Sequence, residues 1–224
     1  MASGLQHHVR ISRDARRCLL AAFVALLLLC VHRAQAFDTV VIDAGHGGDD
    51  RGGIPGQRVS EKAMTLDVAR RLEGHLRSAG FRTVMTRRTD SYVPLSTRVA
   101  IGNRQRNAVF VSIHFNSARR VGAVGTETFY YSAASRPLAA SIQRGLVSTV
   151  AMEDRGLKRR GFYVLRHSRI PAVLVEGGFL TNPTEARRIS QASHRERLAR
   201  EIADAVVESR GSGRFGRGSL QASR

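Results

Sequence analysis

The sequence predicts an α/β domain built around a mostly parallel sheet. Short apolar segments that are typical of strands alternate with longer segments whose apolar residues recur at helical spacing. Several of the strand segments are apolar on both faces, as burial between two helix layers requires. The chain has 224 residues, which favours a single domain with a sizeable core.

The predicted elements follow one another along the chain after residue 36. The predicted strands are residues 39–43, 81–86, 108–114, 126–131, 161–165 and 172–176. The predicted helices are residues 60–78, 91–104, 136–150, 184–189 and 194–209. In the second of these helices we expect Leu95, Val99 and Ala100 to face the core.

The first 36 residues differ from the rest of the chain. Residues 1–17 are largely polar and carry arginines, residues 18–31 are apolar without a break, and Ala34-Gln35-Ala36 follows. This order is typical of a secretory signal peptide. An uncleaved anchor is the alternative, although the apolar run is shorter than the roughly 20 residues of a spanning helix. Arg16-Arg17 permits the twin-arginine route and the very apolar core favours the general secretory route, so both stay open.

These observations divide the chain into three parts. We predict a signal peptide over residues 1–36, one folded domain over 37–210 and a disordered basic tail over 211–224. The mature protein is then expected in the periplasm or elsewhere in the cell envelope.

Cysteine content and charge limit the chemistry of that exported domain. Both cysteines, Cys18 and Cys30, lie in the predicted leader, so a metal site in the domain must use histidines and carboxylates. The formal net charge is +18, nearly all of it from arginine. Such a charge suits either a solvated basic surface or an anionic cell-wall polymer or membrane surface as partner. Nucleic acid is not expected as a partner of an exported protein.

Four polar residues stand at the ends of predicted elements. His46 follows the first strand, His114 ends the third, Glu176 ends the last, and Glu61 opens the first helix beyond a glycine-rich loop. Functional residues of doubly wound sheets lie at the carboxyl ends of the strands. Two histidines and one carboxylate form a suitable zinc ligand set, and a second carboxylate can transfer protons. The glycines of the loop allow a sharp bend and an open cleft.

Other interpretations of these residues are weaker or remain open. A single histidine at a strand end is more often an ordinary surface residue. With two histidines and two suitably placed glutamates, placement alone leaves the surface interpretation and the metal-site interpretation near even. His75, His167 and His194 are interpreted as structural or solvated. The glycine loop does not match G-x-G-x-x-G, because Asp50 occupies its last position, and no P-loop or G-x-S-x-G elbow occurs.

Several segments resemble the zinc-dependent N-acetylmuramoyl-L-alanine amidases of bacterial cell-wall turnover. They are residues 41–48 (VIDAGHGG), 60–62 (SEK), 112–116 (SIHFN) and 171–182 (PAVLVEGGFLTN), supported by 155–158 and 162–166. The resemblance runs from about residue 39 to residue 207 in the order of the family, and the number of motifs makes it specific.

The resemblance implies a single α/β domain with a six-stranded sheet flanked by helices. It also implies one zinc ion per chain, held by His46, Glu61 and His114, and Glu176 as the catalytic acid/base. The reaction implied is hydrolysis of the amide between N-acetylmuramic acid and L-alanine, with peptidoglycan as the substrate. A zinc peptidase and a non-catalytic wall-binding protein of the same fold remain alternatives.

One departure from part of that family is informative. Some members carry an inserted helix that blocks the zinc site, after the strand that matches residues 126–131. Here only residues 132–135 separate that strand from the next predicted helix, so we expect no such plug. We also expect no separate wall-binding domain, and a monomer.

Overall fold

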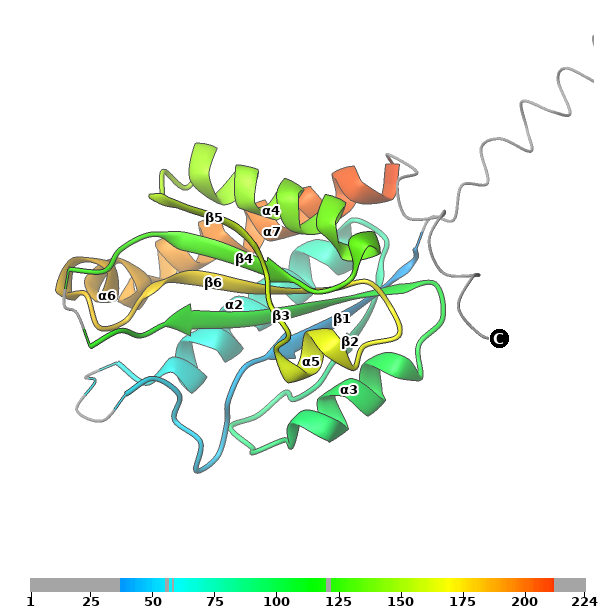
Figure 1. Ribbon diagram of the computed structural model, residues 1–224, viewed down its shortest axis with the longest axis horizontal. Helices are drawn as coiled ribbons and strands as arrows, with labels where there is room; N and C mark the ends of the chain where they lie inside the picture. The colour runs from blue at the N-terminus through cyan, green and yellow to red at the C-terminus, as the bar shows by residue number, and fades with distance from the viewer. Residues whose placement is uncertain (1–36, 55–56, 58, 120–121, 212–224) are drawn as a thin grey trace, which may run out of the picture. The chain divides into compact units, whose positions relative to one another are not determined.

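The computed structural model describes residues 37–54, 57, 59–119 and 122–211 (Figure 1). The predicted signal peptide and nearly all of the predicted tail lie outside these residues. Within them the chain forms an α/β domain whose six-stranded sheet is flanked by helices, as the sequence predicts.

The sheet has the strand order β2-β1-β3-β6-β4-β5. Its strands are β1 (Thr39–Ala44), β2 (Arg82–Met85), β3 (Ala108–Asn116), β4 (Thr126–Tyr130), β5 (Asp154–Arg159) and β6 (Ala172–Phe179). β4 runs antiparallel to β6, and β5 runs parallel to β4. All the other neighbouring strands are parallel. The carboxyl ends of β1, β2, β3 and β6 therefore lie on the same side of the sheet, where β4 and β5 begin.

Helices of unequal extent cover the two faces (Figure 1). They are α2 (Glu61–Ser78), α3 (Leu95–Asn103), the 3-10 turn η1 (Ala133–Ser135), α4 (Arg136–Ser148), α5 (Tyr163–Arg166), α6 (Pro183–Ser190) and α7 (Ala192–Gly211). α2, α4 and α7 bury the larger apolar core against one face, whereas the short α3 and α5 cover a smaller core on the other. Among the described residues, no helix is long and apolar enough to cross a membrane.

One predicted strand is wrong, and one predicted helix is wrong in part. The predicted strand at residues 161–165 is instead the single-turn helix α5, whose Val164 and Leu165 pack onto the sheet. The edge strand is β5, and its sequence DRGLKR has no apolar run because none of its residues is buried.

The second predicted helix begins only at Leu95, which is 53% exposed, and Arg98 is buried in its place. Ala100 is exposed as well, and Val99 alone faces the core as predicted.

The alternation of side chains along the strands decides where polar groups emerge. Phe110 of β3 and Leu174 of β6 point to the face that α3 and α5 cover. Every second residue points the same way, so His114 and Glu176 lie on this face, further along the same strands. They are paired in register across the β3–β6 ladder.

Candidate metal centre

Two histidines and one glutamate meet at the carboxyl ends of β1 and β3. His46 follows β1, His114 lies near the end of β3, and Glu61 is the first residue of α2. One ligand atom from each lies within 4.8 Å of the others. Glu61 Oε1 is 3.1 Å from Nε2 of His46 and 3.0 Å from Nδ1 of His114. These nitrogens and this oxygen form the one group of three or more possible metal ligands among the described residues.

Two of these three side chains, His46 and Glu61, have a further polar contact outside the group. Asp50 Oδ2 lies 2.8 Å from Nδ1 of His46, so the other ring nitrogen of His46 is the one that faces Glu61. The backbone N–H of Phe115 donates to Glu61 Oε1 at 3.0 Å. A carboxylate behind a metal-binding histidine fixes the orientation and tautomer of its ring. Asp50 was not identified from the sequence, although its place four residues after His46 in the glycine loop was visible there.

The glycines of the loop allow the backbone to bend, and they also leave space for the side chains of His114 and Glu61. A β-carbon at Gly45 would lie 2.5 Å from Nε2 of His114, and one at Gly52 would lie 2.5 Å from Oε2 of Glu61. Gly52 also has φ of +69°, a conformation that side chains other than glycine disfavour. His46 itself adopts φ of +59°, an uncommon conformation for a residue other than glycine. The tight packing and the unusual backbone both occur where His46, Glu61 and His114 meet.

Two buried arginines donate hydrogen bonds to the backbone at the start of this loop. Arg98 pairs with the buried Asp43 at 2.7 Å and donates to the carbonyl oxygens of Ala44 and His46 at 2.6 and 2.7 Å. Arg87 donates to the carbonyl oxygens of Ala44 and Gly45 at 2.9 and 2.8 Å. The backbone that carries His46 is therefore fixed by charged hydrogen bonds rather than by side-chain packing alone.

The electrostatics of the cluster favour a positive charge beside Glu61. Burial by itself would raise the pKa of Glu61, but hydrogen bonds and charges from His114 and His46 hold that pKa at about 2. Burial by itself would lower the pKa of His46, but Glu61 and Asp50 together raise it above its ordinary value. The carboxylate stays ionised between two imidazoles, which suits a cation.

Glu176 lies beside this cluster without being one of its three members. Burial first, and then the charges of Glu61 and Glu127, raise the pKa of Glu176 well above its ordinary value. Its Oε2 is buried and has no hydrogen-bond partner among the described residues. An unpaired buried carboxyl oxygen is costly, so its presence calls for a chemical reason.

Glu127 is a further carboxylate at this edge that the sequence did not reveal. It is the second residue of β4 and pairs with Glu176, because β4 runs antiparallel to β6. Asn116 donates to Glu127 at 2.5 Å, and Lys158 of β5 forms a close ion pair with it. Its carboxylate is therefore paired within the fold, and it is not a member of the possible metal-ligand group.

The other histidines of the domain lie elsewhere, as predicted. His75 of α2 contacts Glu196 of α7 at 2.8 Å, and the ring of His167 packs on Tyr163. His194 is buried in α7. None of them belongs to the metal-ligand group found in the described part of the chain.

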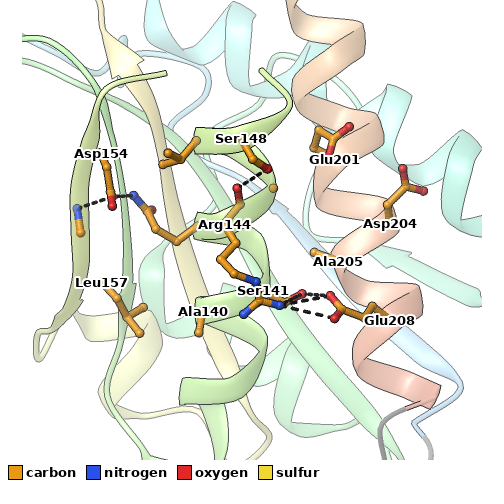
Figure 2. A pocket seen from close by; sticks show the side chains of 14 residues that line it. Ala140, Ser141, Arg144, Ser148, Asp154, Leu157, Glu201, Asp204, Ala205 and Glu208 are labelled. Atoms are coloured by element: carbon orange, nitrogen blue, oxygen red, sulfur yellow. Dashed lines mark hydrogen bonds and ion pairs between the residues drawn. The ribbon is translucent and has the colours of Figure 1, made fainter. Parts of the chain in front are cut away.

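A separate hollow of about 750 Å³ lies away from His46, Glu61 and His114, between α4, β5 and α7 (Figure 2). Glu201, Asp204 and Glu208 line it, and no histidine does. Gln143 donates a hydrogen bond to Asp154 at 2.6 Å, and Arg144 contacts Glu208 at 3.4 Å, so part of the polar lining of this hollow is paired within the fold. Its helices cover the opposite face of the sheet.

An α/β domain with two histidines and one carboxylate at the carboxyl ends of a mostly parallel sheet has the donor set of a mononuclear metalloenzyme. Comparison with known proteins narrows this class. Residues 40–208 match the family described as N-acetylmuramoyl-L-alanine amidase. The chain therefore belongs to the N-acetylmuramoyl-L-alanine amidases, and the prediction of an amide hydrolase of this family is confirmed.

Individual relatives agree with this assignment. The chain is 37% identical over 174 residues to N-acetylmuramoyl-L-alanine amidase LytC of Bacillus subtilis, covering 76% of this chain but only 35% of LytC. It is 36% identical to the uncharacterized protein YqiI of the same organism, covering 85% of this chain and 95% of YqiI. The solved catalytic domain of the amidase CwlV from Bacillus (Paenibacillus) polymyxa superposes with a TM-score of 0.74 at 34% identity. That match covers 77% of this chain and 97% of the CwlV domain.

Proposed function

We propose that this protein is a zinc-dependent N-acetylmuramoyl-L-alanine amidase that cleaves the amide between N-acetylmuramic acid and the L-alanine of the peptidoglycan stem peptide. The observation that carries the proposal is the cluster of His46, Glu61 and His114 with Glu176 beside it, in a chain of this family. The donor set fits zinc, which prefers imidazole nitrogen and carboxylate oxygen in three-ligand catalytic sites.

Zinc bound by these three side chains would polarise the scissile carbonyl and make a water molecule acidic near neutral pH. Asp50 would keep Nδ1 of His46 engaged and leave Nε2 of His46 for the metal. Glu61 would supply the anionic ligand, since its carboxyl group is ionised at neutral pH.

Glu176 is the proposed acid/base. Its carboxyl group faces the same cavity as His46 and His114, and its Oε2 has no partner within the described fold. It would accept the proton of the attacking water and deliver it to the alanine nitrogen as the amide breaks.

The remaining assignments complete the proposal. We infer that residues 1–36 are an export signal, that residues 37–210 are the catalytic domain and that residues 211–224 are a basic tail. The mature enzyme would act as a monomer in the periplasm or cell envelope, with its basic surface near anionic wall polymer. Between β4 and α4 the chain has only Tyr131, Ser132 and η1, which supports a cleft without an inserted plug.

Product analysis tests this function. Purified protein is loaded with zinc, its metal content is measured, and it is incubated with purified peptidoglycan. Mass spectrometry should detect intact stem peptides that begin with L-alanine, together with glycan strands that keep the lactyl group. Peptides cut at an internal bond would indicate a zinc peptidase, and zinc binding without any release would indicate a wall-binding protein; either result would overturn the proposal.

A further inference from the structure

The exposed apolar side chains of the domain are concentrated at one place. Among the described residues, five large hydrophobic side chains are exposed: Tyr92, Leu95, Phe162, Tyr163 and Val207. The first four line a single cavity of about 370 Å³. His46, His114 and Glu176 line that same cavity. Exposed apolar groups that converge on a pocket mark a binding site more often than a packing defect.

Two separate parts of the fold present these side chains to the cavity. Tyr92 and Leu95 come from the segment that leads into α3, and a β-carbon at Gly48 would lie 2.7 Å from the backbone nitrogen of Tyr92. This segment therefore rests directly on the glycine loop. Phe162 and Tyr163 come from the start of α5, where Phe162 packs edge-on against Phe129 with ring centroids 5.0 Å apart. Leu174 of β6 lines the same cavity between these two segments.

A second cavity with different chemistry adjoins the metal ligands. It has a volume of about 510 Å³ and is formed by the glycine loop, with Asp49, Arg51 and Gln57 in its lining. His46 and Asp50 line both cavities, so they stand between them. A bond cleaved at the metal ligands would have one half of its substrate in each cavity.

The two halves of a muramoyl–peptide bond differ in the same way as the two cavities. A pyranose ring presents apolar C–H groups and an N-acetyl methyl group that pack well on aromatic faces. A stem peptide presents backbone amides and charged ends, which need hydrogen bonds and opposite charges when they are desolvated. Arg51 and Asp49 offer such partners, and the cavity between α3 and α5 offers mainly apolar surface.

We propose that Tyr92, Leu95, Phe162 and Tyr163 form the glycan subsite of this enzyme, and that the cavity containing Arg51 receives the stem peptide. This assignment rests on the amidase function proposed above. It makes these side chains determinants of specificity for the sugar, without a part in proton transfer.

Two substrates that share the scissile amide separate the subsites. One is a disaccharide–stem peptide, and the other is a lactyl–stem peptide that lacks the sugar ring. Tyr92→Ala and Phe162→Ala should each lower kcat/KM on the disaccharide substrate about tenfold, the size of one lost aromatic contact, and much less on the sugar-free substrate. Arg51→Ala should lower both by the same factor, because both keep the peptide. Val207→Ala, which removes an exposed apolar side chain outside the cavity, is the matched control.

Direct binding supplies a second readout. Peptide-free GlcNAc–MurNAc disaccharide is titrated into the zinc-loaded protein and followed by NMR. Wild type, Arg51→Ala and Val207→Ala should bind it alike, whereas Tyr92→Ala should bind it about tenfold more weakly. Phe162 also packs on Phe129, so Tyr92→Ala is the decisive variant if Phe162→Ala is poorly folded.

The outcomes distinguish failure of this inference from failure of the function. Equal losses by Tyr92→Ala on both substrates, or disaccharide binding that is absent in wild type or unchanged in Tyr92→Ala, would overturn the glycan subsite. If wild type releases no stem peptide from the disaccharide substrate or from peptidoglycan, the amidase function itself is wrong.

Discussion

The imidazole ring of His114 lies against the backbone of Gly45, where a β-carbon would approach Nε2 to 2.5 Å. Gly45→Ala must therefore displace either the ring or the loop that carries His46. We expect zinc affinity to fall at least about tenfold, as for other changes that misalign a ligand, with a matching loss of activity at limiting zinc. Chelator competition measures the affinity, and thermal unfolding reports whether the fold is retained.

Gly74→Ala is the control for that change. Gly74 lies within α2, and apart from its chain neighbours and the backbone of its own helix no described atom lies within 4 Å of where its β-carbon would stand. This variant should bind zinc normally and gain about 0.5–1 kcal/mol of stability. Wild-type zinc affinity in Gly45→Ala would show that the close approach does not fix the position of His114.

Replacing Glu176 by Gln separates proton transfer from metal binding. The side chain keeps its size but can no longer accept and deliver a proton, so turnover should fall at least about 100-fold. Zinc content should stay at the wild-type level, because Glu176 is outside the ligand group. Glu201→Gln, in the distant hollow of Figure 2, should behave as wild type. A Glu176→Gln variant with more than a tenth of normal activity would remove Glu176 from its proposed role.

Loss of the buried Asp43–Arg98 pair should destabilise the whole domain. Arg98→Met leaves the Asp43 carboxylate in the core without its salt bridge, and its remaining hydrogen-bond partners among the described residues are the hydroxyl groups of Ser112 and Thr86. Breaking such a pair from one side costs about 3–5 kcal/mol, measurable as a lower urea midpoint at unchanged slope. The double variant with Asp43→Asn should recover part of that loss, because no charge is then left unpaired.

A surface pair supplies the comparison for Arg98. Arg144 and Glu208 are 3.4 Å apart with both side chains more than 60% exposed. Arg144→Met should therefore change the free energy of unfolding by less than about 1 kcal/mol. Equal effects of Arg98→Met and Arg144→Met would contradict the role given to the buried pair.

Acid should weaken the fold through His194. Burial, and then the charges of Arg197, Arg188 and Arg195, lower the pKa of His194 to about 4, against 6.5 for a free histidine. Between these values the unfolded chain binds a proton that the folded chain does not, so stability falls as pH drops from 6.5 to 4. The expected loss is about 3 kcal/mol. Urea unfolding at several pH values should show this loss in wild type, and His194→Gln should lack that share of the pH dependence.

Local sequence patterns predicted most of the fold but not the edge strand β5. β1, β3 and β6 are apolar on both faces because helices cover both sides, and this pattern is visible in the sequence. β5 pairs with one neighbour only, so its side chains need not be apolar and the segment does not look like a strand. The aromatic and β-branched residues of 162–165 suggest a strand, yet they form one helical turn over the smaller core.

The same contrast applies to the site. His46, Glu61 and His114 stand at element ends, so strand direction made their meeting plausible, and the family resemblance then indicated them as one ligand set. The residues that hold them depend on contacts between distant segments, such as Arg98 with Asp43, 55 positions apart. Glu127 reaches the site only because β4 is reversed, and no local pattern indicates the direction of a strand.

The hydrogen bonds from Arg98 to the glycine loop restrict how the site can move. Arg98 joins the carbonyl oxygens of Ala44 and His46 to a carboxylate inside β1, so the loop cannot detach without exposing a buried ion pair. We therefore expect this part of the loop to open only together with the central strands, as one cooperative unit. Amide hydrogens near His46 should then exchange as slowly as those of β1, which is unusual for a glycine-rich active-site segment.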